Sequence, residues 1–557
     1  MSGPGGGLMV CGAGSDAGKT TLVTGLCRAL RRRGVRVAPF KGQNMALNSF
    51  VTSAGHEIGR STAAQAMAAG VEPEVAMNPV LLKPNDDRTA QVVVLGRPWR
   101  TLDAATYQRS KGGLFGTVTE ALEDLRSRFE VVICEGAGSP AEINLAPLDI
   151  ANLRVAASAR IPAVIVADID RGGVFASLYG TVSLLPPDQR RWVIGFVINR
   201  LRGDPALLGD GPAQLERLCG LPTLGVLPWL EWLGMDAEDS LALRQPRPWL
   251  SPEESEPDWR FPDRGSREVI DVAVVRFPRI ANFTDFDALA IEPGVSVRMV
   301  SGPRALGAPD LVILPGSKAT LADLAWLRAS GLAAEVTERA SRGEVSVLGI
   351  CAGYQMLGRR ITDGIEDSGT EPVDGLGLLA AGTTFARDKV TRQRRGRGLG
   401  QPVEGYQIHH GRTSGTEPWL ELDGPAPGEG PEGSSAREGR ILGTSLHGLF
   451  DADGFRDCFL GQVAARAGKA WVPSGTHFAA HRRAQADRLA DVLEHHLDDR
   501  ILDGLAGQAG GGGLWPLGAP YEVPALRAVR PAQFEVQPAP ARRPAESTAK
   551  LDASPTP

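Results

Sequence analysis

The chain has 557 residues, too many for one hydrophobic core, so we expect two large domains or about three smaller ones. Its net charge of -5 argues against a nucleic-acid partner held by bulk charge. The 6 cysteines are scattered without a CxxC pair, which excludes zinc knuckles and disulfide frameworks and indicates a reducing compartment. Residues 1–7 lack the basic and apolar segments of a secretion signal, and no long apolar run follows. We therefore expect a cytoplasmic protein without a membrane partner.

Short apolar runs alternate with amphipathic segments along most of the chain. The first series occupies residues 8–11, 35–40, 131–134, 163–167 and 193–198, with a helix expected after Lys19. A second series occupies residues 269–276, 311–314, 345–350 and 443–446 and ends in an amphipathic helix near residues 482–502. Buried strands that alternate with helices predict parallel sheets covered on both faces, so both halves are expected to be α/β domains.

Two segments differ in composition from these halves. Residues 233–268 are rich in Pro, Trp and charged residues and are expected to form a linker. Residues 504–557 contain a glycine run at residues 510–513 and are then rich in Pro, Ala and Arg, so we expect a disordered tail.

A glycine-rich loop joins the first expected strand to the first expected helix. In this context backbone N–H groups point at phosphate, a lysine reaches the terminal phosphates, and a hydroxyl holds magnesium. We therefore predict a nucleotide site made of Gly12, Asp16, Gly18, Lys19, Thr20 and Thr21. The loop is one residue longer than the common pattern and resembles that of dethiobiotin-synthetase-like ligases.

An acidic residue, Glu135, ends the strand at residues 131–134 and is followed by glycine. A carboxylate at this end of a parallel strand can hold magnesium beside a nucleotide, so we predict a metal site formed by Thr20 and Glu135. The alternative is a solvated acid at the end of a strand.

Further polar residues lie beside turns at strand ends, where loops often carry function. The candidates for substrate binding are Lys41, Gln43, Asn44, Asp168, Asp170 and Arg171. Each of them singly could instead be a surface residue.

A cysteine lies between an apolar strand and a helical pattern in the second half. Gly349 and Gly353 flank Cys351, as a nucleophile on a sharp strand-to-helix turn requires. The alternative is a buried structural cysteine. His447 follows the strand at residues 441–445 and is the expected general base.

Residues 314–317 resemble the oxyanion-hole loop of class I glutamine amidotransferases, so we assign that role to the backbone N–H groups of Gly316 and Ala352, with Ser317 as the alternative to Gly316. The glutamate that usually follows the histidine by two residues is missing, because Leu449 stands there. What orients His447 is therefore open. Residues 405–411 are expected to form a loop in which His409 either lines a glutamine pocket or lies on the surface.

Four segments resemble segments that occur in the same order in the cobyric acid synthase family: residues 41–49, 135–145, 168–176 and 195–200. The resemblance runs from about residue 8 to about residue 500 and departs at Gly42, where proline is usual. It implies amidation of the b, d, e and g carboxylates of a corrinoid, adenosylcobyrinic acid a,c-diamide, with ATP, Mg²⁺ and glutamine. A separate resemblance to dethiobiotin-synthetase-like ligases implies that Asn199 contacts adenine, although a structural asparagine is the alternative.

These observations predict an α/β protein of two domains. Residues 1–232 are expected to form a dethiobiotin-synthetase-like P-loop domain and residues 269–503 a class I glutamine-amidotransferase-like domain. Two other functions stay open: a nucleotide-driven switch of the partition ATPase type, and an amidotransferase for another carboxylated substrate. The oligomeric state is not predicted.

Overall fold

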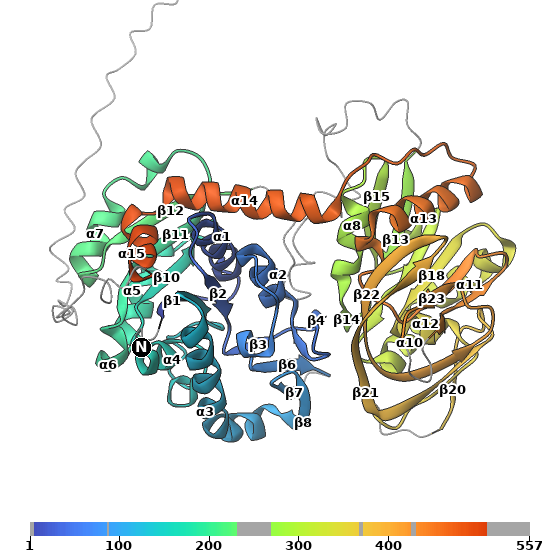
Figure 1. The fold of residues 1–557 in the computed structure, drawn as a ribbon, viewed down its shortest axis with the longest axis horizontal. Coiled ribbons are helices and arrows are strands. Elements are labelled where there is room, and N and C mark those ends of the chain that lie inside the picture. Colours follow the sequence, from blue (N-terminus) through green and yellow to red (C-terminus); the bar gives the residue numbers. More distant parts are fainter. Residues whose placement is uncertain (1–4, 86–87, 231–268, 367–370, 425–429, 510–557) are drawn as a thin grey trace, which may run out of the picture.

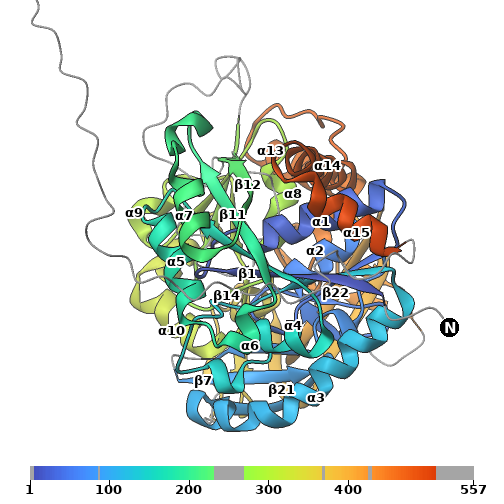
Figure 2. The same cartoon turned by 90° about the vertical axis from the view of Figure 1, so that its left-hand side faces the viewer.

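The structure, a computed structural model, describes residues 5–85, 88–230, 269–366, 371–424 and 430–509. Two α/β domains lie side by side, and one long helix, α14 (Phe478–His496), runs along both of them (Figure 1). Figure 2 shows the first domain in front of the second. The predicted fold class is confirmed. None of the helices in these ranges is long and apolar enough to cross a membrane.

The first domain is built on a parallel sheet with the strand order β12-β11-β10-β1-β9-β2. The strands are β1 (Gly6–Gly12), β2 (Val37–Phe40), β9 (Val131–Glu135), β10 (Ala163–Asp168), β11 (Val193–Leu201) and β12 (Thr223–Pro228). Successive residues of a strand point to opposite faces. Leu8 and Val10 pack under helix α1 (Lys19–Arg32), while Met9 and Cys11 belong to a second core on the other face. Both faces are covered, which explains why the strands are apolar throughout.

The opposite face carries α3 (Ala104–Arg128), α4 (Leu153–Ala159) and α5 (Val174–Leu184), and shorter helices complete the domain. An insertion between β2 and β9 was not expected from the sequence. It contains the strands β3 (Gln43–Met45), β4 (Ser49–Val51), β5 (Glu57–Gly59), β6 (Val80–Pro84), β7 (Thr89–Val94) and β8 (Arg97–Asp103), and the helix α2 (Arg60–Ala69).

The second domain has a mostly parallel sheet with the order β15-β13-β16-β18-β26-β25. The strands are β13 (Ile270–Val275), β15 (Val295–Val300), β16 (Leu311–Leu314), β18 (Ser346–Ile350), β26 (Ile441–Thr444) and the antiparallel edge strand β25 (Ser434–Ala436). Its main helices are α10 (Thr320–Ala329), α11 (Leu332–Arg342), α12 (Ala352–Leu357) and α13 (Asp453–Arg466).

A long hairpin of β21 (Ala381–Gly398) and β22 (Gln401–Gly415) is added to the second domain. The expected loop at residues 405–411 was wrong, since these residues pair with β21 as part of β22. Polar sequence suggested a loop, but the backbone groups find their partners across the hairpin.

The C-terminal helices belong to both domains. Phe478, at the start of α14, packs in the core of the second domain, whereas Leu493 packs in the core of the first. The following helix, α15 (Asp499–Ala509), buries Ile501, Leu502 and Leu505 in that same first-domain core. The expected domain end at residue 503 and the tail starting at residue 504 are therefore corrected, because apolar residues at helical spacing continue past residue 503. The expected linker at residues 233–268 and residues 510–557 of the tail lie outside the described residues.

The insertion of the first domain contacts the second domain directly. Ser49 N donates to Asn282 Oδ1 at 2.9 Å, and Phe283 N donates to Asn48 Oδ1 at 3.3 Å. Tyr406 OH of the second domain also donates to Ser49 O at 3.0 Å. The three contacts fix residues 48 and 49 against the second domain.

Candidate active sites

The glycine-rich loop lies between β1 and α1, where the sequence placed it. Gly18 has φ 101°, and a Cβ at this position would lie 2.0 Å from Asn199 Nδ2, so only glycine fits. Lys19 is buried and its Nζ donates to Gly14 O at 3.0 Å and to Gly138 O at 3.2 Å. The loop and the segment after β9 thus close around the lysine. Gly12 and Thr21 lie at the two ends of this loop, in β1 and in the first turn of α1.

Glu135 lies beside the loop at the end of β9 and is fully buried. Its Oε1 accepts hydrogen bonds from Thr20 Oγ1 and from Lys41 Nζ, both at 2.8 Å, and its Oε2 accepts from Gln65 Nε2 at 2.5 Å. Burial by itself raises the pKa of Glu135, but the Lys41 charge and the three hydrogen bonds hold it below its usual value. Glu135 is therefore a buried carboxylate, and the alternative of a solvated acid is wrong.

Thr20 and Glu135 are suited to share a magnesium ion. Mg²⁺ is usually bound by one or two protein oxygens together with nucleotide phosphates and water. The Thr20 hydroxyl and the Glu135 carboxylate are 2.8 Å apart beside the phosphate loop and supply such a pair. The described residues contain no cluster of three or more acidic, His or Cys side chains that could hold a metal by themselves.

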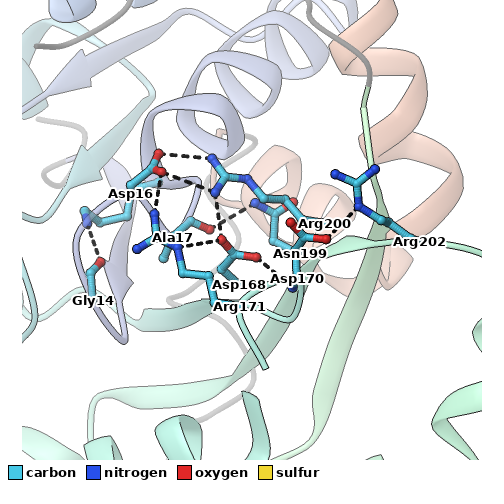
Figure 3. Close-up of polar contacts among 10 residues, drawn as sticks. Gly14, Asp16, Ala17, Asp168, Asp170, Arg171, Asn199, Arg200 and Arg202 are labelled. Carbon is cyan, nitrogen blue, oxygen red and sulfur yellow. Dashed lines mark hydrogen bonds and ion pairs between the residues drawn. The ribbon is translucent and has the colours of Figure 1, made fainter. Parts of the chain in front are cut away.

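A charged network joins the loop to the ends of β10 and β11 (Figure 3). Asp16 pairs with Arg171 at 2.7 Å and with Arg200 at 3.0 Å, and Arg200 also pairs with Asp168 at 2.7 Å. Asp170 lies beside this network and pairs with Arg202 at 2.6 Å. The structure thus brings three predicted substrate residues, Asp168, Asp170 and Arg171, to the phosphate loop.

The other predicted residues of this domain mainly contact protein. Asn199 Nδ2 donates to Ala17 O at 3.0 Å and so supports the loop backbone, as the structural alternative requires. Gln43 Oε1 accepts from Tyr107 OH at 2.7 Å. Lys41 and Asn44 are buried, and Asn44 Oδ1 is without a hydrogen-bond partner in the described structure.

Cys351 occupies the sharp turn between β18 and α12. Its backbone has φ 53° and ψ -107°, an unfavourable conformation for a residue with a side chain. The neighbouring glycines permit it: a Cβ on Gly349 would lie 2.6 Å from Tyr354 N, and one on Gly353 would lie 1.8 Å from Leu314 O. The geometry is that of a nucleophile elbow.

The structure shows what orients His447. His447 Nδ1 donates to Asp285 Oδ2 at 2.7 Å, and Gly448 N donates to Asp285 Oδ1 at 2.9 Å. Burial by itself lowers the pKa of His447, but the Asp285 carboxylate and a hydrogen bond with Cys351 raise the pKa to about 10. Cys351, His447 and Asp285 therefore form a triad.

Sequence reasoning missed Asp285, which lies 162 residues before His447. It belongs to a 3-10 helix, Phe283–Phe286, which follows β13 and the short strand Ile280–Ala281. The available signal was the four polar residues at 282, 284, 285 and 287, which alternate with Phe283 and Phe286 beyond a buried strand. Such a pattern marks functional loops only weakly.

A cavity lies beside Cys351 and His447. Gly316, Ala352, Cys351 and His447 all line it, so the predicted oxyanion-hole residues and the two predicted catalytic residues come together. His409 also lines it, and the alternative of a surface histidine is wrong. The remaining lining residues are Lys83, Ala281, Asn282, Ser317, Lys318, Thr320, Gln355, Glu366, Phe385, Lys389, Ile408 and His410.

A phosphate-loop domain joined to a domain with a Cys-His-Asp nucleophile elbow defines a ligase of the glutamine amidotransferase class. Residues 8–240 match the CobQ/CobB/MinD/ParA nucleotide binding domain, and residues 271–455 match the CobB/CobQ-like glutamine amidotransferase domain.

Known relatives resemble the chain over nearly its full length. Cobyric acid synthase of Frankia casuarinae is 51% identical over 545 residues, which cover 93% of this chain and 99% of the relative. The enzyme of Nocardia farcinica is 52% identical over 512 residues, covering 89% and 96%, and that of Rhodococcus jostii is 50% identical over 525 residues, covering 94% and 98%. The chain belongs to the cobyric acid synthase family.

Proposed function

We propose that the enzyme uses ATP and glutamine to amidate the b, d, e and g carboxylates of adenosylcobyrinic acid a,c-diamide, giving adenosylcobyric acid in cobalamin biosynthesis. The observation that carries this proposal is the presence of two complementary sites in one chain. One is the phosphate loop with Thr20 and Glu135, and the other is the triad of Cys351, His447 and Asp285. The acceptor is taken from the family. We place the reaction in the cytoplasm, where a reactive thiol stays reduced.

Ammonia is released at the triad. Cys351 gives its proton to His447, whose ring is held by Asp285, and the thiolate attacks the side-chain amide carbon of glutamine. Backbone N–H groups of Gly316 and Ala352 stabilise the oxyanion. His447 returns the proton to the leaving nitrogen, ammonia departs, and water then hydrolyses the thioester to glutamate and free Cys351.

The carboxylate is activated at the phosphate loop. Lys19 and the loop backbone hold the ATP phosphates, and Mg²⁺ held by Thr20 and Glu135 would neutralise their charge. A corrinoid carboxylate oxygen attacks the γ-phosphorus, releasing ADP and forming an acyl phosphate, which ammonia converts to the amide with loss of phosphate.

We place the corrinoid at the charged network of the first domain. The Arg171 and Asp170 side chains are 58% and 35% exposed beside the phosphate loop, so they are available to its peripheral groups. The buried Lys41 acts on Glu135 instead and keeps that carboxylate ionised.

Mass spectrometry of the a,c-diamide corrinoid incubated with ATP, Mg²⁺ and glutamine tests the proposal. We expect four successive mass decreases of about one unit each, since every step replaces OH with NH₂. Cys351→Ala should abolish the reaction with glutamine and preserve it with ammonia. An unchanged corrinoid with both nitrogen sources would contradict the proposed acceptor. A variant that also loses the ammonia reaction would contradict the assignment of separate roles to the two sites.

A further inference from the structure

The cavity around Cys351 contains charged side chains that the mechanism above does not use. Three lysines, Lys83, Lys318 and Lys389, and one glutamate, Glu366, line it. Their side chains are only 5%, 11%, 8% and 15% exposed. Lys83 comes from β6 of the first domain, whereas the other three belong to the second. Charged groups of this kind are rarely buried without a partner or a ligand.

A fully buried carboxylate holds two of these lysines together. Lys83 and Lys389 each approach one oxygen of Glu57 at 2.5 Å, and Lys83 also donates to Ser49 Oγ at 2.9 Å. Each ammonium has three N–H donors, so these bonds use two donors of Lys83 and one of Lys389. Both lysines therefore keep donors for a further acceptor.

The charges on this wall do not balance. Lys318 has its own partner in Glu366 at 3.6 Å, whereas Lys83 and Lys389 share one carboxylate, Glu57, so this pair of lysines carries one positive charge more than the carboxylate between them. The neighbouring His410 adds no charge near neutral pH, since burial lowers its pKa to about 4. Burial, together with the charges of Lys83 and Lys318, likewise lowers the pKa of Lys389 to about 8, although Glu57 opposes the shift. An anion bound between these lysines would offset the excess positive charge.

A hydrogen-bond acceptor also faces the cavity. The Nδ1–H of His409 donates to Gly411 O at 2.6 Å, which leaves Nε2 as an acceptor. In the described part of the chain this buried nitrogen has no partner. The cavity therefore offers donors for an anion and an acceptor for an N–H group, as a zwitterion requires.

We infer that Lys83 and Lys389 bind the α-carboxylate of glutamine and that Glu366 binds its α-ammonium group. The assignment rests on the proposed glutaminase activity, because the side-chain amide must reach Cys351. The charged end of glutamine then lies against the remaining, charged wall of the cavity. Since Lys83 and Glu57 belong to the first domain, the glutamine site is complete only when the two domains are in contact.

Substrate analogues with one charged group removed test this inference in the full chain. γ-Aminobutyramide keeps the amide and the ammonium group but lacks the α-carboxylate, and glutaric acid monoamide lacks the ammonium group. Lys389→Met should raise KM for glutamine roughly 10- to 100-fold and leave kcat/KM for γ-aminobutyramide unchanged. Glu366→Gln should act in the same way on glutamine but leave glutaric acid monoamide unaffected. Lys83→Met, in the first domain, should have the same effect as Lys389→Met on KM for glutamine and on kcat/KM for γ-aminobutyramide.

Lys469→Met is the matched control, because Lys469 pairs with Asp310 at 2.7 Å away from the cavity lining. It should leave KM for glutamine unchanged. Ammonia-dependent amidation should be normal in every variant, and failure of wild-type enzyme with ammonia would refute the proposed function instead. An unchanged KM in Lys389→Met would overturn the inference. An equal loss of kcat/KM for glutamine and γ-aminobutyramide would also overturn it, because it indicates that Lys389 has only a structural role. Lys389→Arg should restore part of the affinity for glutamine.

Discussion

At the scale of single residues, Asp285 controls what His447 can do. Its carboxylate holds the imidazole through Nδ1, which leaves the opposite nitrogen for the Cys351 thiol. We expect Asp285→Asn to lower glutamine-dependent activity at least about 100-fold, the usual contribution of a positioned base. Glutamate release measures the loss. Ammonia-dependent amidation should be unchanged, and a parallel loss there would show that Asp285 supports the fold rather than the base.

The same pair predicts how stability depends on pH. The pKa of His447 is raised to about 10 in the folded enzyme, so the folded state binds the proton more tightly than an unfolded histidine of pKa about 6.5. The stability that Asp285 contributes is then full below about pH 6.5 and is lost as pH rises toward 10. Urea unfolding should show the largest difference between wild type and Asp285→Asn at pH 6 and a smaller one at pH 9. A difference that grows with pH would contradict the assignment.

In the proposed mechanism, carboxylate activation depends on Glu135. Glu135→Gln removes the negative charge beside Thr20 and breaks the buried ion pair with Lys41. We expect amidation with glutamine and with ammonia to fall together by at least about 100-fold, because the shared activation step is lost. Mass spectrometry of the corrinoid measures the loss of amidation, and ADP formation measures the loss of carboxylate activation. Glu130→Gln, immediately before β9, is the control and should stay active. Normal ammonia-dependent amidation in Glu135→Gln would contradict the role of Glu135.

At the scale of elements, α15 acts as part of the first domain although it comes last in the described chain. Ile501, Leu502 and Leu505 are buried against the core under α1. A chain ended after Asp498 should therefore be less stable than one ended after Ala509, by about 1.5 to 3 kcal/mol for each buried side chain. Thermal unfolding of the two truncated chains compares them directly, since both lack residues 510–557. Equal melting temperatures would show that α15 contributes little to the core.

Elements that are determined by residues close together in the sequence could be predicted from it. The strand before Lys19 and the turn at Cys351 follow from apolar runs and glycines within a few residues. The position of Asp285 could not be predicted, because it depends on contacts between segments 162 residues apart in sequence. The strand at residues 405–411 was missed for the same reason, since its partners lie in β21. Glu135 was predicted from the sequence as a site residue, but its contact with Lys41 could be recognised only from the fold.

At the scale of the whole molecule, one segment of the first domain reaches both active sites. Its beginning, Lys41, contacts Glu135 beside the phosphate loop, and its end, Ser49, contacts Asn282. Asn282 Nδ2 in turn lies 3.3 Å from His447 Nε2. The segment is thus a physical connection between carboxylate activation and ammonia release, through buried polar contacts.

Tyr406 provides a test of that connection. Its ring stacks on His447 at a centroid distance of 5.3 Å, and its hydroxyl donates to Ser49 O across the domain boundary. Tyr406→Phe keeps the ring and removes the hydroxyl that makes this interdomain hydrogen bond, which contributes about 1 kcal/mol.

We expect Tyr406→Phe to weaken domain contact about fivefold, so that more glutamate is released for each amide formed, while ammonia-dependent amidation keeps its rate. Parallel measurement of glutamate and corrinoid amide gives the ratio. Tyr179→Phe, on helix α5 at the far side of the first domain (Figure 1), should leave the ratio at the wild-type value. If Tyr406→Phe also leaves it unchanged, the hydroxyl bond does not couple the sites, and the connection depends on the Asn48 and Asn282 contacts instead.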